Sequence, residues 1–127
     1  MRKWLAPVLL AVALGNTGPL VASHHPAHTL DEAWIKGALA GDVEALVALY
    51  APDAVLYTPG TMEARGTEAI RKDLTGLFTA FTVKDMKIDA VYETTGSLSV
   101  GWGRFTMNVV PKTGGGAPQT WEGRASV

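Results

Sequence analysis

The feature that most constrains the fold is a run of alternating residues in the second half of the chain. Within residues 82–94, every second position from Met86 to Tyr92 is apolar or aromatic, and the positions between them are mostly charged. This pattern predicts a strand with two different faces. Gly96 turns the chain, residues 98–110 alternate again, and a third alternating segment starts at Thr120 after a glycine-rich loop. The second half therefore predicts a meander of antiparallel strands.

The first half of the chain shows helical signals instead. Thr29 to Glu32 has the form of a capping box, and apolar residues follow at helical spacing up to Gly41. Asp42 is placed to cap a second helix over residues 43–50, which Pro52 stops. The two helices are expected to form a compact hairpin.

Short segments connect these helices to the meander. Residues 54–58 and 61–65 predict two short strands around Pro59-Gly60. A third helix is expected from Gly66 or Thr67, because apolar residues recur at helical spacing between Ile70 and Phe78. Helices followed by a meander predict an α+β fold with a curved antiparallel sheet.

The N-terminus has the layout of a secretory signal peptide. A basic start is followed by a mostly apolar, uncharged run to Leu14, and Ala22 or Ser23 offers a cleavage site. Residues 1–23 are thus expected to direct export to the periplasm or medium. Residues 24–28 contain all three histidines and are read as a disordered spacer rather than a metal site, leaving residues 29–127 as the domain.

Composition excludes several classes of function. Eleven basic and twelve acidic residues offer no basic surplus for nucleic acid, and the absence of cysteine excludes disulfides, zinc–thiolate sites and a cysteine nucleophile. We expect no metal, no cofactor and no membrane contact after signal cleavage. Val127 falls inside an alternating segment without a closing turn, so we expect the domain to be truncated at its C-terminus.

Two stretches of the chain resemble a known superfamily. Residues 40–55, AGDVEALVALYAPDAV, and residues 66–71, GTEAIR, are similar to the nuclear transport factor 2-like superfamily, in its SnoaL-like and ketosteroid-isomerase-like branch. The resemblance covers residues 29–127. It implies a cone in which a bent sheet wraps the helices around a deep apolar pocket. It also implies about six strands, of which five are counted here, so one or more final strands are expected to be missing.

The resemblance also locates the positions of the catalytic residues. Ketosteroid isomerases use an aspartate base with an oxyanion hole of a tyrosine and a protonated aspartic acid. The tyrosine position falls on Trp34, the base on Thr58 and the second acid near Ser126. Thr58 and Ser126 cannot replace carboxylic acids, so isomerase activity of this kind is not expected.

The same positions suggest which face of the sheet lines the pocket. If Thr58 and Ser126 point inward, the alternation places one face of the last two strands in the pocket. The pocket or ligand-binding candidates are Trp34, Thr58, Trp102, Arg104, Arg124 and Ser126, with Glu122 on the same face. Such a pocket suits a small, partly apolar molecule with a carboxylate or carbonyl oxygen. The alternative is that this face is solvated, or forms a dimer interface, with ordinary cross-strand ion pairs.

Three functions remain open at this stage. The first is an exported domain that binds a small organic molecule. The second is a lyase, isomerase or hydrolase with Glu122 as base and Arg104 or Arg124 as electrophile. The third is a non-catalytic dimerisation domain. The resemblance implies a homodimer through the outer sheet face, and the contact candidates are Trp121, Ala125, Phe105 and Met107.

Overall fold

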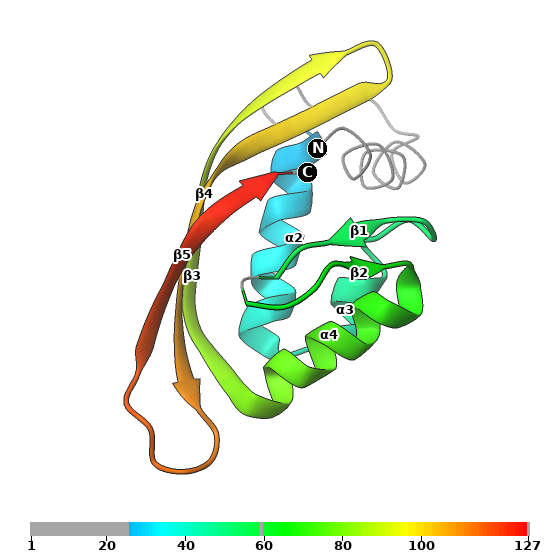
Figure 1. The fold of residues 1–127 in the computed structure, drawn as a ribbon. Coiled ribbons are helices and arrows are strands. Elements are labelled where there is room, and N and C mark those ends of the chain that lie inside the picture. The colour runs from blue at the N-terminus through cyan, green and yellow to red at the C-terminus, as the bar shows by residue number, and fades with distance from the viewer. Residues whose placement is uncertain (1–25, 59, 127) are drawn as a thin grey trace.

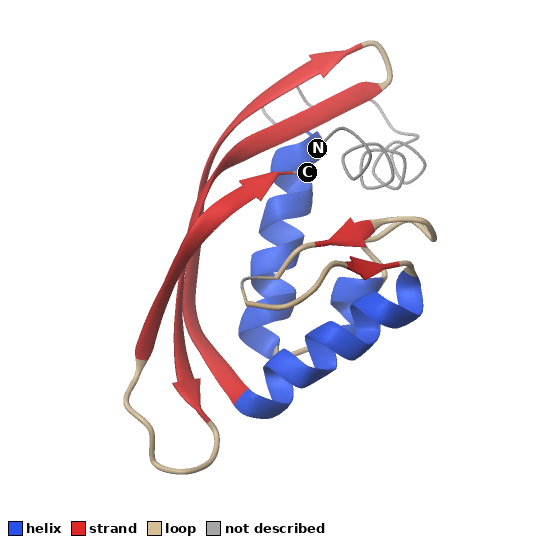
Figure 2. Cartoon of the chain, viewed as in Figure 1, coloured by secondary structure: helices blue, strands red, loops and turns tan. Residues whose placement is uncertain are grey.

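The computed structural model describes residues 26–58 and 60–126, so the predicted export signal lies outside the described residues. In this part of the chain, three helices lie on one side of a bent three-stranded sheet, and a short two-stranded hairpin lies beside the helices (Figure 1). Figure 2 shows the helices gathered on the concave side of the sheet. The α+β class and the curved antiparallel sheet predicted from the sequence are confirmed. No helix in the described part of the chain is long and apolar enough to cross a membrane.

The first two helices form the predicted hairpin. Helix α2 spans Pro26–Ala40 and helix α3 spans Val43–Val47. Between them, Gly41 adopts a φ of 64°, which favours glycine. Asp42 caps α3 as expected, because its Oδ1 accepts the backbone N–H of Ala45 at 3.0 Å. Helix α3 is shorter than the predicted 43–50, and residues 48–50 continue it as turns.

The start of α2 corrects the predicted spacer. The helix begins at Pro26 rather than at Thr29, and Ala27 is fully buried. Proline is compatible with the first turn of a helix, where its missing N–H has no intrahelical partner. His28 consequently belongs to the helix, and its ring meets the ring of Tyr92 edge-on with centroids 5.3 Å apart. Residues 24 and 25 lie outside the described residues.

The segment after α3 forms a minimal hairpin and then the third helix. Strand β1 spans Val55–Leu56 and strand β2 spans Ala64–Arg65, both shorter than predicted. Helix α4 spans Thr67–Ala80 and buries its apolar stripe of Ile70, Leu74 and Phe78, as its spacing predicts.

The main sheet is an antiparallel meander. Strand β3 spans Phe81–Thr95, β4 spans Leu98–Pro111 and β5 spans Gln119–Ser126, in the order β3-β4-β5. The register is continuous except for an irregularity between Val83 and Asp85. Counting β1 and β2, the described residues contain the five strands that the sequence predicts.

The structure reverses the predicted orientation of β4 and β5. Met107 and Val109 are buried in the core, and Phe105 packs against it. Because side chains alternate along a strand, Arg104 and its neighbour Arg124 on β5 belong to the outer face. The sequence-based assignment placed these arginines on the inner face because it aligned Ser126 with a family position across the glycine-rich loop. A shift of one residue moves every side chain of a strand to the other face.

The same reversal corrects the predicted dimer contacts. Trp121, Phe105 and Met107 lie on or against the core, and Ala125 is on the same inner face of β5. They are therefore not exposed on the outer face. The dimer itself stays a prediction.

The close approach of β3 and β4 at Gly103 gives a test of the fold. A Cβ atom added there would lie 1.9 Å from the carbonyl oxygen of Asp89, whereas one added at Gly76 on α4 would meet nothing within 4 Å. Gly103→Ala should therefore lower the free energy of unfolding by about 1–3 kcal/mol or more. Gly76→Ala should raise it by up to about 1 kcal/mol, because alanine favours a helix. Urea denaturation measures both, and equal effects of the two changes would contradict the described strand contact.

Candidate functional site

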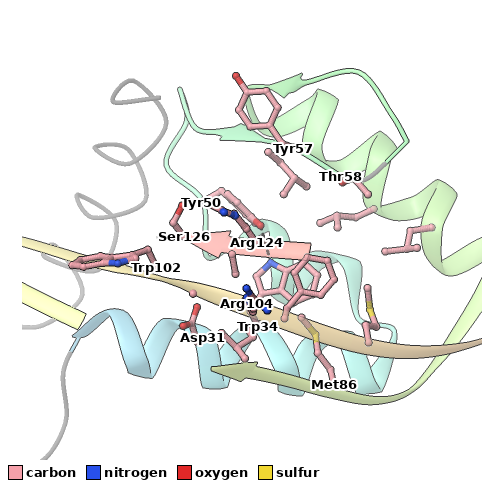
Figure 3. Close-up of a pocket in the computed structure, with 18 of the residues that line it drawn as sticks. Asp31, Trp34, Tyr50, Tyr57, Thr58, Met86, Trp102, Arg104, Arg124 and Ser126 are labelled. Carbon is pink, nitrogen blue, oxygen red and sulfur yellow. Dashed lines mark hydrogen bonds between the residues drawn. The ribbon is translucent and has the colours of Figure 1, made fainter. Parts of the chain in front are cut away.

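A cavity of about 890 Å³ lies between the helices, the β1–β2 hairpin and the sheet (Figure 3). Its walls are mainly apolar, with residues from α2, α4, β1 and all three strands of the main sheet. The apolar lining includes Val55, Leu56, Leu74, Leu77, Met86, Ile88, Phe105 and Met107. Cavities of this size and composition are typical of small-molecule sites.

A tryptophan and a tyrosine form the first polar group of the cavity. Trp34 on α2 donates its Nε1–H to the hydroxyl oxygen of Tyr50 at 2.7 Å. Burial raises the pKa of Tyr50 to about 12, with smaller contributions from the charges of Asp73 and Asp31. The phenol is therefore protonated at neutral pH. Within the described residues no acceptor takes its proton, so the Tyr50 O–H is available to an oxygen atom in the cavity.

Thr58 provides the second polar group. Its Oγ1 donates to Oδ2 of Asp73 on α4 at 2.5 Å. Leu56, Tyr57 and Thr58 all line the cavity, and Tyr57 is 58% exposed and donates to Glu63 on the hairpin. The exposed Tyr57 between the half-buried Leu56 and Thr58 agrees with the predicted alternation only in part. The Asp73 carboxylate is therefore connected to the cavity only indirectly, through its hydrogen bond with Thr58.

Asp31 is the third polar group, and it is a buried acid. Its side chain rises from α2 into the cavity (Figure 3), and the residue is only 5% exposed. The Tyr92 hydroxyl on β3 donates to Asp31 Oδ2 at 2.6 Å. Burial raises the pKa of Asp31, and the Tyr92 hydrogen bond and the charge of His28 oppose this effect in part. A carboxyl in such surroundings is a common feature of functional sites.

The sequence-based reading missed Asp31 and the role of Tyr50. It treated Asp31 only as part of a capping box and Tyr50 only as an apolar helix residue. A signal for Asp31 was present, because it precedes Trp34 by three residues and Ala38 by seven, which places it on the buried stripe of α2. No comparable signal marked the pairing of Tyr50 with Trp34, which are 16 residues apart.

The predicted arginines lie at the border of the cavity. Arg104 on β4 is directly opposite Arg124 on β5, and both are exposed. They border the cavity together with Trp102 and Ser126, although alternation assigns their side chains to the outer face of the sheet. The cavity therefore borders all six predicted pocket residues. Contact of the arginines with a ligand stays a prediction.

Glu122, the predicted base, does not line the cavity. It is paired with Thr106 in the register of β4 and β5, and it is exposed. Since Thr106 and Arg104 share one face of β4, Glu122 also belongs to the outer face.

The buried carboxyl of Asp31 predicts how the free energy of unfolding differs between acid and neutral pH. Because its pKa is raised in the folded protein, Asp31 favours folding at low pH, and this contribution is lost as the pH rises through the folded-state pKa. Asp31→Asn keeps an acceptor for Tyr92 and removes the titration. Urea denaturation should therefore show that Asp31→Asn changes stability more favourably at pH 7 than at about pH 3. The exposed Asp89→Asn is the control, and an Asp31→Asn effect that is the same at both pH values would contradict the described burial.

Comparisons with known proteins agree with this geometry. The model of the SnoaL-like domain family matches residues 32–125. No curated protein matches the sequence significantly. Among solved structures, a ketosteroid isomerase-like protein from Erwinia carotovora atroseptica SCRI1043 has a TM-score of 0.67 at 18% identity, with 79% of this chain and 78% of that chain covered.

Two further solved structures have the same fold. A conserved protein from Planctomyces limnophilus DSM 3776 has a TM-score of 0.67 at 19% identity, with 77% of this chain and 75% of that chain covered. An LEH-like epoxide hydrolase from M. tuberculosis has a TM-score of 0.57 at 14% identity, with coverages of 77% and 68%. At these identities the similarity shows the fold alone. The family match over most of the chain shows that this protein belongs to the SnoaL-like domain family of the nuclear transport factor 2-like superfamily.

Proposed function

We propose that this SnoaL-like domain binds a small, partly apolar organic molecule in the cavity, with an oxygen atom of the ligand on the Tyr50 hydroxyl. The observation that carries the proposal is the hydrogen bonding of the partly buried Tyr50 phenol. Its oxygen accepts the Trp34 N–H, and within the described residues its own O–H donates to no acceptor. A carbonyl or hydroxyl oxygen is the simplest partner for that proton.

In this proposal the apolar walls of the cavity and the Tyr50 phenol contribute differently to binding. Apolar walls contribute affinity through burial, at about 25 cal/mol per Å² of apolar surface removed from water. The Tyr50 hydroxyl orients the ligand, because its O–H is a hydrogen-bond donor next to the apolar lining. The hydrogen bond from Trp34 polarises the phenol and makes it a stronger donor to the ligand.

Enzymatic activity is the alternative, as a lyase, isomerase or hydrolase that uses general acid/base chemistry. Similar structures described as ketosteroid isomerase-like and as an LEH-like epoxide hydrolase support it only through the fold. Glu122 lies on the outer face, so it could act as base only on a ligand bound there. In the cavity, the carboxyl available for such chemistry is Asp31.

Export and dimerisation belong to the same proposal. The charged start and apolar run of residues 1–23 support export. A homodimer through the outer sheet face would use Val91 and Trp102, which are 60% and 43% exposed, instead of the four residues expected from the sequence. Sedimentation at micromolar protein concentration tests this, and a monomer would contradict it.

The Tyr50 donor is tested with two ligands of the same ring skeleton. 2-Tetralone carries a ketone oxygen, and tetralin does not. Tyr50→Phe should weaken the binding of 2-tetralone by about 2- to 10-fold, which is the effect of one net hydrogen bond of about 0.5–1.5 kcal/mol. Tetralin affinity should stay within about twofold, because phenylalanine keeps the ring that contacts it. Isothermal titration calorimetry measures both affinities.

Trp121→Phe is the matched control for the variant Trp34→Phe. Trp121 does not line the cavity, and its Nε1–H donates to Gln119. Trp34→Phe should weaken 2-tetralone binding by a smaller factor than Tyr50→Phe, since only the polarising donor is lost. Equal losses of both ligands in Tyr50→Phe would show that the phenol shapes the cavity but does not bind the ligand oxygen.

A further inference from the structure

Asp31 is a buried carboxyl that forms no ion pair with the described residues. Buried aspartates are ordinarily paired with a cation. Here, no lysine or arginine of the described residues forms an ion pair with Asp31, which accepts a hydrogen bond from Tyr92. His28 lies close enough for its charge to act on Asp31, but its ion-pair contact is with Glu32, from Nδ1 to Oε2 at 3.6 Å.

The second carboxylate oxygen of Asp31 is accessible from the cavity. Tyr92 occupies Oδ2, and no fully enclosed side-chain oxygen or nitrogen in the described residues lacks a partner. Among the described residues, Oδ1 of Asp31 has no hydrogen-bond partner, and since the residue lines the cavity, this oxygen retains some accessible surface. A ligand in the cavity can therefore reach this oxygen.

Aromatic rings lie on the same side of the cavity as this carboxyl. Trp34 is one helical turn after Asp31, and Tyr50 meets Trp34 through their hydrogen bond (Figure 3). Carboxylates and aromatic faces are the two kinds of group that attract an alkylammonium ion in proteins. Arg104 and Arg124 also line the cavity, but among the described residues neither forms an ion pair with Asp31.

We propose that Asp31 binds the ammonium group of the ligand, with the rings of Trp34 and Tyr50 beside it, and that the ligand class is an apolar primary amine. This inference rests on the proposed binding function and specifies its ligand. A ligand of this class that also carries an oxygen atom can place it on Tyr50, because Asp31 and Tyr50 line the same cavity.

The energetics favour an occupant with a positive charge. Folding already leaves Asp31 only 5% exposed, so most of the desolvation cost of the carboxylate does not recur when the ligand binds. The ligand then has to desolvate only its own ammonium group. Tyr92 holds the carboxylate in place before binding, which reduces the entropy lost on association.

Calorimetry at pH 7 with 2-aminotetralin, tetralin and 2-tetralone tests the proposal. The amine is protonated at this pH, and the three compounds share one ring skeleton. Asp31→Asn should weaken 2-aminotetralin binding by about tenfold or more, because it removes the charge that pairs with the ammonium group. Tetralin and 2-tetralone should bind Asp31→Asn within about twofold of the unaltered protein, which also shows that the cavity is intact.

Two further variants complete the test. Asp89→Asn removes an exposed carboxylate that pairs with Lys87, and it should leave all three affinities unchanged. Asp31→Ser removes the carboxylate with a smaller side chain and replaces Asp31→Asn if that variant does not fold. The proposal is overturned if the folded Asp31 variant binds 2-aminotetralin as tightly as the unaltered protein. It is also overturned if the unaltered protein binds 2-tetralone but not the amine.

Failure of the broader binding function gives a different result. In that case neither tetralin nor 2-tetralone binds the unaltered protein, whatever the amine does. If 2-tetralone binds and depends on Tyr50 while the amine shows no dependence on Asp31, only the ammonium site is excluded.

Discussion

The packing of one face of β4 against the helices determines the rest of the structure. Val109 and Met107 on this face are buried together with Leu46, Ile70 and Leu74 from α3 and α4. Their burial supplies the apolar contact that holds a bent sheet and separate helices in one core. Because the strand is pleated, the same contact decides the orientation of every other side chain on β4 and, through the register, on β3 and β5.

The cavity follows from where this packing stops. Further along β4, Gly103 lines the cavity and contributes no side chain to it. Helix α2 contributes Asp31 and Trp34 to this region. The hydrogen bond from Tyr92 to Asp31 then connects α2 to β3. A buried acid is tolerated there because its oxygen has a donor and because the cavity is accessible.

Much of the fold was predictable from the sequence because its signals are local. Helical spacing located α4 and its buried residues, Asp42 marked the start of α3, and alternation located all three long strands. The start of α2 was misplaced because a proline and three histidines were taken as a spacer. The candidate site was predictable only in part. The cavity borders the six expected pocket residues, but the carboxyl inside it is Asp31 and not Glu122.

The sequence by itself determined the kinds of element, their order and the family to which they belong, since these depend on periodicity and on short motifs. Only the tertiary structure decided which face of the sheet is inside. Both faces of β4 alternate with the same period, and the choice between them depends on contacts between Met107 or Val109 and helices distant in the sequence. It also decided which polar groups meet. Trp34 and Tyr50, or Asp31 and Tyr92, become partners only when the helices are packed on the bent sheet.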